Sequence, residues 1–160
     1  MEKILRGAYK ADMVAHIQSH PEDFDEFIKL ALSTKQPCAW RAAWLLYSCM
    51  DKNDMRLQVY VEQMIEMLPL KNESTNREFL MILQKMKINP DLEGKLFDVC
   101  VAIWENTKLA QSGRYNALKL MLKIAKNYPE LQNEITFLLD ERYTESCTKG
   151  IKHSISKLMR

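Results

Sequence analysis

The sequence contains little glycine, proline and histidine. Its 160 residues include four Gly and five Pro, whereas collagen-like and low-complexity disordered chains are rich in both. Hydrophobic residues make up 47% of the chain, yet no apolar run approaches the ~20 residues of a membrane span. The charged residues 1–6 are unlike a secretory signal, and no segment alternates as a β-strand does. We therefore expect one all-α domain over residues 1–160, in the cytoplasm and not in a membrane.

No catalytic or metal-binding motif is apparent. The cysteines form no Cys-x-x-Cys pair and are predicted to be reduced core thiols; they are Cys38, Cys49, Cys100 and Cys147. A glycine-rich phosphate loop and the signals of a Ser-His-Asp or Cys-His site are absent. Three histidines leave few groups for general acid–base catalysis. The expectation is a protein that is not an enzyme and uses no cofactor.

Two series of helix signals repeat along the chain, out of phase with each other. A proline followed by a carboxylate, which suits the first turn of a helix, precedes an apolar stripe at Pro21, Pro90 and Pro129, and Asp54 stands where a fourth member is expected. The second series has spacings of 36, 39 and 36 residues and consists of Arg41, Arg77, Asn116 and Lys152. Two helices per period predict stacked helical hairpins, a right-handed α-α superhelix of about four repeats.

Individual segments add detail to this prediction. The segments 38–50 and 112–126 are apolar on nearly every side, so each is expected to be covered by more than one neighbour. Asn89 before Pro90 is predicted to cap a helix, and Thr75 with Glu78 is predicted to form a capping box.

The segment Trp40–Leu46 resembles the first-helix signature of HEAT repeats, in which a basic residue precedes small and then large apolar residues. Tyr115–Leu122 looks like a second copy with Asn116 in the basic position. The resemblance covers the chain from about Pro21 onward and implies a HEAT-like α-solenoid. A lone arginine on an apolar helix must be paired or reach water.

In HEAT proteins this basic residue usually binds a loop carboxylate of a neighbouring repeat. The resemblance therefore implies a structural ladder in which Arg41 pairs with Asp51 or Asp54.

Three functional hypotheses remain open. The leading one is a non-enzymatic scaffold for a protein partner. The alternative is a nucleic-acid-contacting domain that resembles the DNA-alkylation-repeat proteins. The sequence is also similar to a group of small bacterial HEAT-like proteins, some of which are labelled adenylosuccinate lyase. Such lyases have a Ser- and Gly-rich catalytic loop with a Met-Pro pair, which this sequence lacks, so a lyase-like enzyme is the least favoured hypothesis.

Two groups of residues have both a functional and a structural interpretation. Asp12, His16 and His20 have the i, i+4, i+8 spacing of one helix face, which suits a metal, but a solvated polar face is favoured and no metal site is predicted. Four aromatic residues could line a binding pocket, although core packing is favoured; they are Trp40, Trp44, Tyr47 and Trp104.

The charge of the chain is unevenly distributed. The net charge is only +2, and residues 1–80 carry 10 basic against 12 acidic residues, whereas residues 81–160 carry 13 against 9. Stacking of successive helices is expected to bring six lysines together on a surface for acidic partners or phosphates; they are Lys119, Lys123, Lys126, Lys149, Lys152 and Lys157. A solubilising cap is the favoured interpretation of these lysines, because lysine-rich faces are a common way to solvate a helix.

Overall fold

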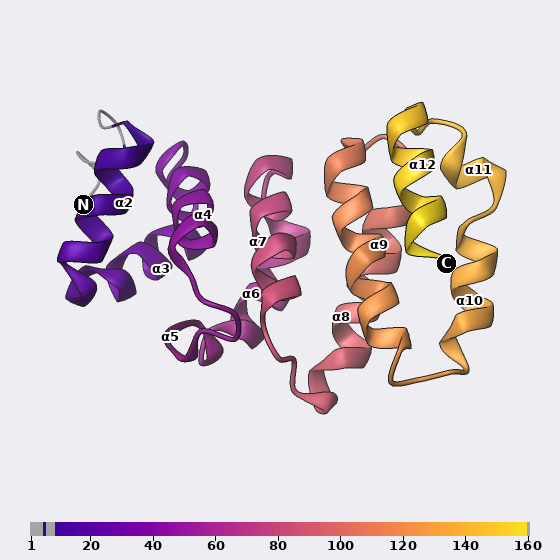
Figure 1. The fold of residues 1–160 in the computed structure, drawn as a ribbon, viewed down its shortest axis with the longest axis horizontal. Coiled ribbons are helices and arrows are strands. Elements are labelled where there is room, and N and C mark those ends of the chain that lie inside the picture. The colour runs from indigo at the N-terminus through magenta and orange to yellow at the C-terminus, as the bar shows by residue number, and fades with distance from the viewer. Residues whose placement is uncertain (1–4, 6–8, 160) are drawn as a thin grey trace. The chain divides into compact units, whose positions relative to one another are not determined.

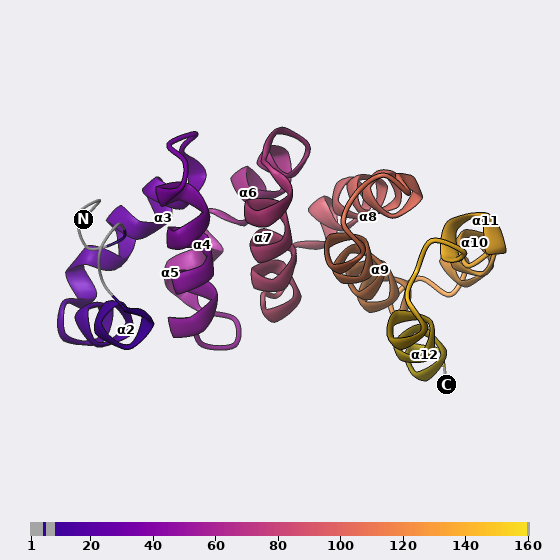
Figure 2. The same ribbon diagram turned by 90° about the horizontal axis from the view of Figure 1, so that it is seen from above.

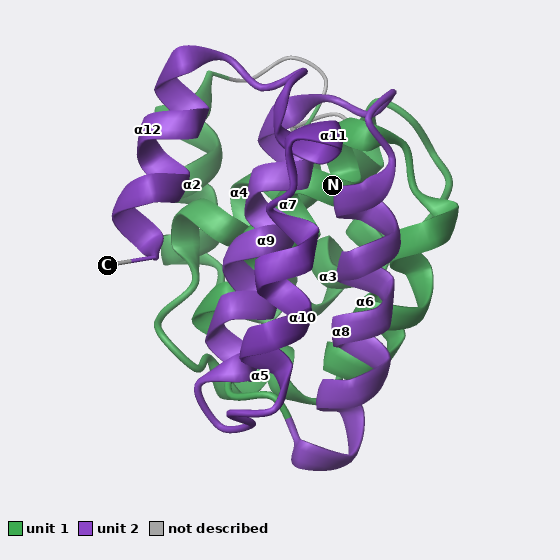
Figure 3. Cartoon of the chain, turned by 90° about the vertical axis from the view of Figure 1, so that its right-hand side faces the viewer, with its two compact units in different colours: residues 1–88 green, residues 89–160 purple. Residues whose placement is uncertain are grey.

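The computed structural model describes residue 5 and residues 9–159, and every regular element among them is a helix (Figure 1). The predicted all-α class is therefore confirmed for this part of the chain. The chain divides into two compact units, residues 1–88 and residues 89–160 (Figure 3). Each unit is described separately below, and the expectation of one domain over residues 1–160 stays a prediction.

Unit 1 is built around a helix that is packed on several sides. Helix α4 contacts α2, α3 and α7, and its three alanines, which allow close approach, are fully buried. The prediction that the segment 38–50 is an inner helix is confirmed. The described elements of this unit are α2 (Lys10–Ser19), a 3₁₀ turn (Pro21–Asp23), α3 (Phe24–Leu32), α4 (Cys38–Cys49), α5 (Met55–Gln58), α6 (Val61–Met67), a second 3₁₀ turn (Leu68–Leu70) and α7 (Glu73–Lys85).

Unit 2 repeats this arrangement around α9, which contacts α8, α10 and α12. Figure 2 shows α8 and α10 on one side of this unit and α9 and α12 on the other. The apolar character of α9 on nearly every side follows from this central position. The described elements are α8 (Pro90–Glu105), α9 (Gln111–Ala125), α10 (Leu131–Leu138), α11 (Glu141–Thr144) and α12 (Lys149–Leu158).

The helix starts were predicted with mixed success. The Asn89 side chain accepts a hydrogen bond from the Asp91 amide at 3.2 Å, with Pro90 in the first helical position, as expected. The capping box at Thr75 was wrong. Helix α7 begins earlier because Asn72 is available as a cap, and its Oδ1 accepts from the Thr75 amide at 2.9 Å.

Candidate interaction surface

Five of the six predicted lysines lie on α9 and α12, two helices that start side by side, and Lys126 follows α9 as its C-cap. Gln111, the first residue of α9, donates from Nε2 to the Ser146 carbonyl at 2.8 Å, and its Oε1 accepts from the Thr148 amide at 2.8 Å. Thr148 is the N-cap of α12, so this side chain ties the two helix starts together. Lys119 and Lys157 each lie eight residues into their helices, which places them at a similar height because every residue adds 1.5 Å.

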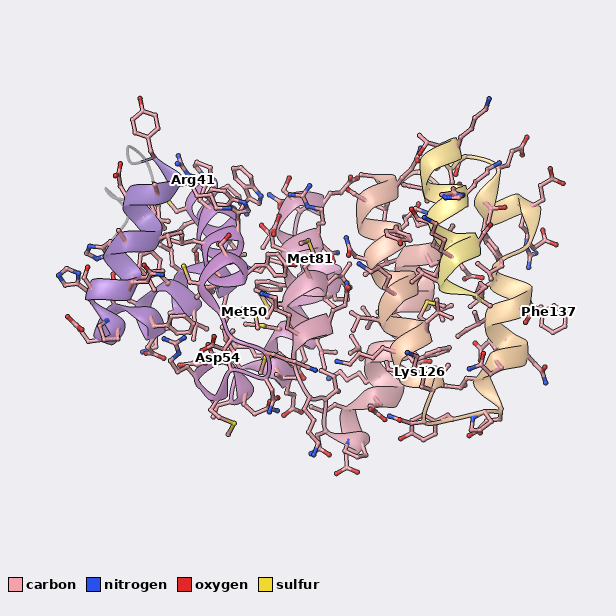
Figure 4. The ribbon with its side chains drawn as sticks, in the orientation of Figure 1. Arg41, Met50, Asp54, Met81, Lys126 and Phe137 are labelled. Carbon is pink, nitrogen blue, oxygen red and sulfur yellow. The ribbon has the colours of Figure 1, made fainter. Side chains whose placement is uncertain are left out.

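We call these six lysines the basic strip. Lys126, at the C-terminal end of α9 (Figure 4), is exposed, as are the three lysines of α12, whereas Lys119 and Lys123 are half-buried. The Lys119 ammonium lies 5.3 Å from the centre of the Tyr115 ring. Neither α9 nor α12 contains Asp or Glu, whereas α8 and α10 together contain five carboxylates and one lysine. The two sides of unit 2 therefore differ in the sign of their charge.

One cation of α9 is not part of any surface. Arg114 is fully buried, and its guanidinium lies 4.8 Å from the centre of the Trp104 ring. Its Nε donates to the Trp104 carbonyl at 2.8 Å, and its terminal nitrogens donate to the Tyr143 carbonyl at 2.5 Å and to Ser146 Oγ at 2.9 Å. Cys147 Sγ lies 4.0 Å away. A buried charge is tolerated when it is hydrogen-bonded in this way.

The partners of Arg114 explain why a cation is stable there without a carboxylate among them. Trp104 lies in the last turn of α8, and Tyr143 lies in the short helix α11. Carbonyls at helix C-termini lack intrahelical donors and carry partial negative charge. Arg114 satisfies them and thereby connects α8, α9 and the segment that leads into α12.

Arg114 also corrects the expected repeat register. Arg41 and Arg114 are each the fourth residue of their helix, and Arg77 is the fifth residue of α7. The three arginines are separated by 36 and 37 residues, so Arg114 and not Asn116 continues the series. The sequence pattern did not reveal this role, because Arg114 stands among lysines in the sequence. Its distance from Arg77, which is close to the distance between Arg41 and Arg77, was the signal that could have identified it.

The carboxylate of Asp54 is bound by a local partner. It accepts hydrogen bonds from Arg56 Nη2 at 2.7 Å and Nε at 3.0 Å, and it caps α5 by accepting from the Arg56 amide. Figure 4 shows Arg41 and Asp54 near opposite ends of α4. Asp54 thus has Arg56 as a close partner, and the ladder pairing of Arg41 with Asp51 or Asp54 that the resemblance implied stays a prediction.

The Arg56 guanidinium, together with the amides of Arg56 and Asp51, holds the pKa of the Asp54 carboxyl below its usual range. A carboxyl with a lowered pKa in the folded state stabilises the fold above its unfolded pKa, and this contribution is lost as the pH falls through the folded value.

We expect Asp54→Ala to lower the free energy of unfolding by about 1–2 kcal/mol near neutral pH, the range for a lost helix cap and its charge. Urea unfolding of the parent and of Asp54→Ala, at neutral pH and below about pH 3, should show a difference in the free energy of unfolding that shrinks at acid pH. A difference independent of pH would contradict this role.

The aromatic candidates are divided between the two units and differ in burial. Trp104 is fully buried in unit 2, and its Nε1 donates to the Leu138 carbonyl at 2.6 Å. Trp44 and Tyr47, in unit 1, are half-buried, with the ammonium groups of Lys10 and Lys85 over their rings at 4.7 and 4.3 Å. Trp40 is also half-buried, and its Nε1 is among the buried polar atoms without a hydrogen-bond partner in the described structure.

The histidines of α2 interact with their neighbours. His16 Nε2 lies 2.8 Å from Asp23 Oδ2, and the His16 ring stacks on the His20 ring with 4.3 Å between centres. Asp12 is exposed. Among residues 5 and 9–159, no three His, Cys, Asp or Glu side chains are grouped closely enough to hold a metal ion.

Packed helical pairs with a basic residue near the start of the second helix define an α-solenoid of repeated hairpins. The model of the HEAT repeat domain family matches residues 3–160, and the chain therefore belongs to the HEAT-repeat family. HEAT repeats are scaffolds commonly used for protein–protein interaction. No curated protein and no solved structure matches the chain. Within the described part of the chain, every helix is too short or too polar to cross a bilayer.

Proposed function

We propose that this HEAT-repeat protein is a non-enzymatic scaffold that binds an acidic protein partner through the basic strip. The observation that carries the proposal is the side-by-side start of α9 and α12, two helices that together contain five lysines and no carboxylate. Complementary charge of this kind accelerates encounter and selects among partners. Three of the four cysteines are buried and none is paired, which supports a role in the reducing cytoplasm.

A protein partner is favoured over nucleic acid for two reasons. The net charge of the chain is only +2, and the other side of unit 2 is acidic, so a duplex would be repelled outside the strip. Stacking of unpaired bases requires accessible aromatic faces near the cations. Trp104 is fully buried, and the exposed Phe137 lies on α10, on the acidic side of this unit.

The test compares two sets of charge reversals of equal size. Lys119, Lys123 and Lys126 are changed together to Glu in one variant, and the exposed Lys52, Lys87 and Lys108 are changed to Glu in the control. Labelled acidic peptides and labelled duplex DNA are titrated by fluorescence anisotropy at about 50 and 200 mM salt. We expect acidic peptides to bind the parent and the control and to lose at least about tenfold in affinity for the strip variant.

Duplex DNA is expected to bind no better than the generic ~10⁻⁴–10⁻⁶ M range at physiological salt. Quantitative affinity capture from the native cell then identifies proteins retained by the parent and the control but lost by the strip variant. Sub-micromolar DNA binding that collapses in the strip variant would contradict the proposal and favour the nucleic-acid alternative.

A further inference from the structure

The acidic side of unit 2 contains a groove with an apolar base. It has a volume of about 380 Å³ and lies between α8, the end of α9 and the start of α10. Phe97, Ile124 and Leu131 supply its apolar lining, and the side chains of Asp98, Glu130 and Glu134 supply carboxylates. No described residue that lines the groove is a lysine or an arginine.

The apolar and the acidic residues of the groove differ in their exposure to solvent. Phe97 and Ile124 are only 4% and 2% exposed and so form the base, whereas the three carboxylate residues are exposed. Arginine and lysine side chains complement this arrangement, because their methylene stems pack on apolar surface while the charged head remains among polar groups. The volume lies near the lower end of the roughly 300–1,000 Å³ typical of ligand sites, which suits one or two side chains.

The wall of the groove is held in place by a neighbouring carboxylate. Glu93 is buried, and it accepts a hydrogen bond from Asn127 Nδ2 at 3.3 Å. Its hydrogen bond with the hydroxyl of Tyr128, a lining residue, raises the pKa of that phenol. Tyr128 is thereby fixed in position, so the groove is formed before any ligand arrives, which lowers the entropic cost of binding.

We propose that this groove binds an arginine or lysine side chain of a partner polypeptide. The stem lies against Phe97, Ile124 and Leu131, and the cationic head lies among the carboxylates of Asp98, Glu130 and Glu134. The site goes beyond the scaffold role of the basic strip, because its carboxylates come from α8 and the start of α10 and select the opposite charge. Its success or failure in a binding test is independent of the strip.

The chain offers a direct spectroscopic test, because it contains only four glycines. Gly94 lines the groove, whereas Gly113 and Gly150 belong to α9 and α12 outside it. The protein is labelled with ¹⁵N-glycine and titrated with a short peptide that has two central arginines flanked by leucines. We expect the Gly94 amide signal to shift in a saturable way, while the Gly113 and Gly150 signals stay unchanged. A signal of Gly94 that does not move would overturn the proposal.

Variants then separate the contributions of charge and space, with binding followed by anisotropy of the labelled peptide. A Cβ at position 94 meets nothing within 4 Å, and we expect the Gly94→Leu side chain to occupy part of the groove that Gly94 lines. Gly150→Leu is the matched control, because Gly150 lies on α12 outside the groove and a Cβ there also meets nothing within 4 Å. We expect Gly94→Leu, and the double variant Glu130→Gln with Glu134→Gln, to weaken binding at least tenfold. Gly150→Leu should bind like the parent. The double variant Glu141→Gln with Glu145→Gln removes the same charge from exposed residues on or beside α11 and should also bind like the parent.

Two further ligands test the identity of the occupant. A peptide with citrulline in place of arginine keeps the shape but loses the charge, and we expect it to bind at least tenfold more weakly. Equal binding of the two peptides would show that the groove selects apolar groups alone and would contradict the proposal. Spermidine that bound as tightly as the arginine peptide would also contradict it, because the site would then recognise a small cation and not a polypeptide.

Discussion

Replacing Arg114 with alanine is expected to destabilise unit 2 by roughly 3–5 kcal/mol, the range for breaking a buried charge network. The change leaves the carbonyls of Trp104 and Tyr143 without this donor and opens a cavity beside the Trp104 ring. Arg114→Met should recover part of the loss, since it restores volume but no hydrogen bond. Arg114→Lys should also be less stable than the parent, because an ammonium cannot replace the planar guanidinium, which reaches several acceptors at once.

Equilibrium urea unfolding measures these differences. Trp104 is the only tryptophan of unit 2, so in a chain with Trp40 and Trp44 changed to Phe its fluorescence reports on this unit. Arg142→Ala is the matched control, because the Arg142 side chain is 67% exposed and exposed ion pairs contribute little; its stability should change by less than about 0.5 kcal/mol. An Arg114→Ala variant as stable as the Arg142→Ala control would refute the structural role.

The second large effect is expected for Trp104→Ala, at roughly 3–5 kcal/mol. Trp104 is fully buried, donates to the Leu138 carbonyl, and lies under the Arg114 guanidinium. Trp104→Phe keeps a ring beneath the guanidinium but leaves the carbonyl without its indole donor, at a cost of about 1–3 kcal/mol.

A double-mutant cycle of Trp104→Leu, which removes the ring, and Arg114→Met, which removes the guanidinium, isolates the interaction between the two side chains. We expect a coupling free energy of about 0.5–3 kcal/mol, as for residues in contact. Circular dichroism follows unfolding here, since the fluorescent reporter is lost. If the losses in free energy of unfolding of the two single variants simply add in the double variant, the contact between the two side chains contributes no stability of its own.

Both predictions concern a pair of side chains that the sequence pattern did not connect. The pattern gave Arg114 no structural role, and it favoured core packing for Trp104 without indicating a partner. Their pairing depends on the turn of Asn106–Ala110, which reverses the chain so that the fourth residue of α9 meets the last turn of α8. A contact between residues ten positions apart across such a turn is not visible in helical periodicity, which relates residues three or four positions apart.

The repeat architecture was determined by the sequence itself. Apolar residues at helical spacing, the Asn89 cap and the recurring basic residue are local or periodic features, and local features are what a linear pattern records. The apolar surroundings of α4 and α9 likewise predicted their central positions, because a helix that is apolar on most sides has to be covered on most sides.

Only the tertiary structure decided which charged side chains are buried or paired and which are exposed on the surface. Arg114 is buried against helix-terminal carbonyls, Asp54 is bound by Arg56 two residues away, and α9 and α12 start side by side through Gln111. The groove beside Gly94 likewise forms only where three consecutive helices pack together. The physical reason is that the energy of a charge depends on its solvation and on neighbours within a few ångströms, and folding alone determines both.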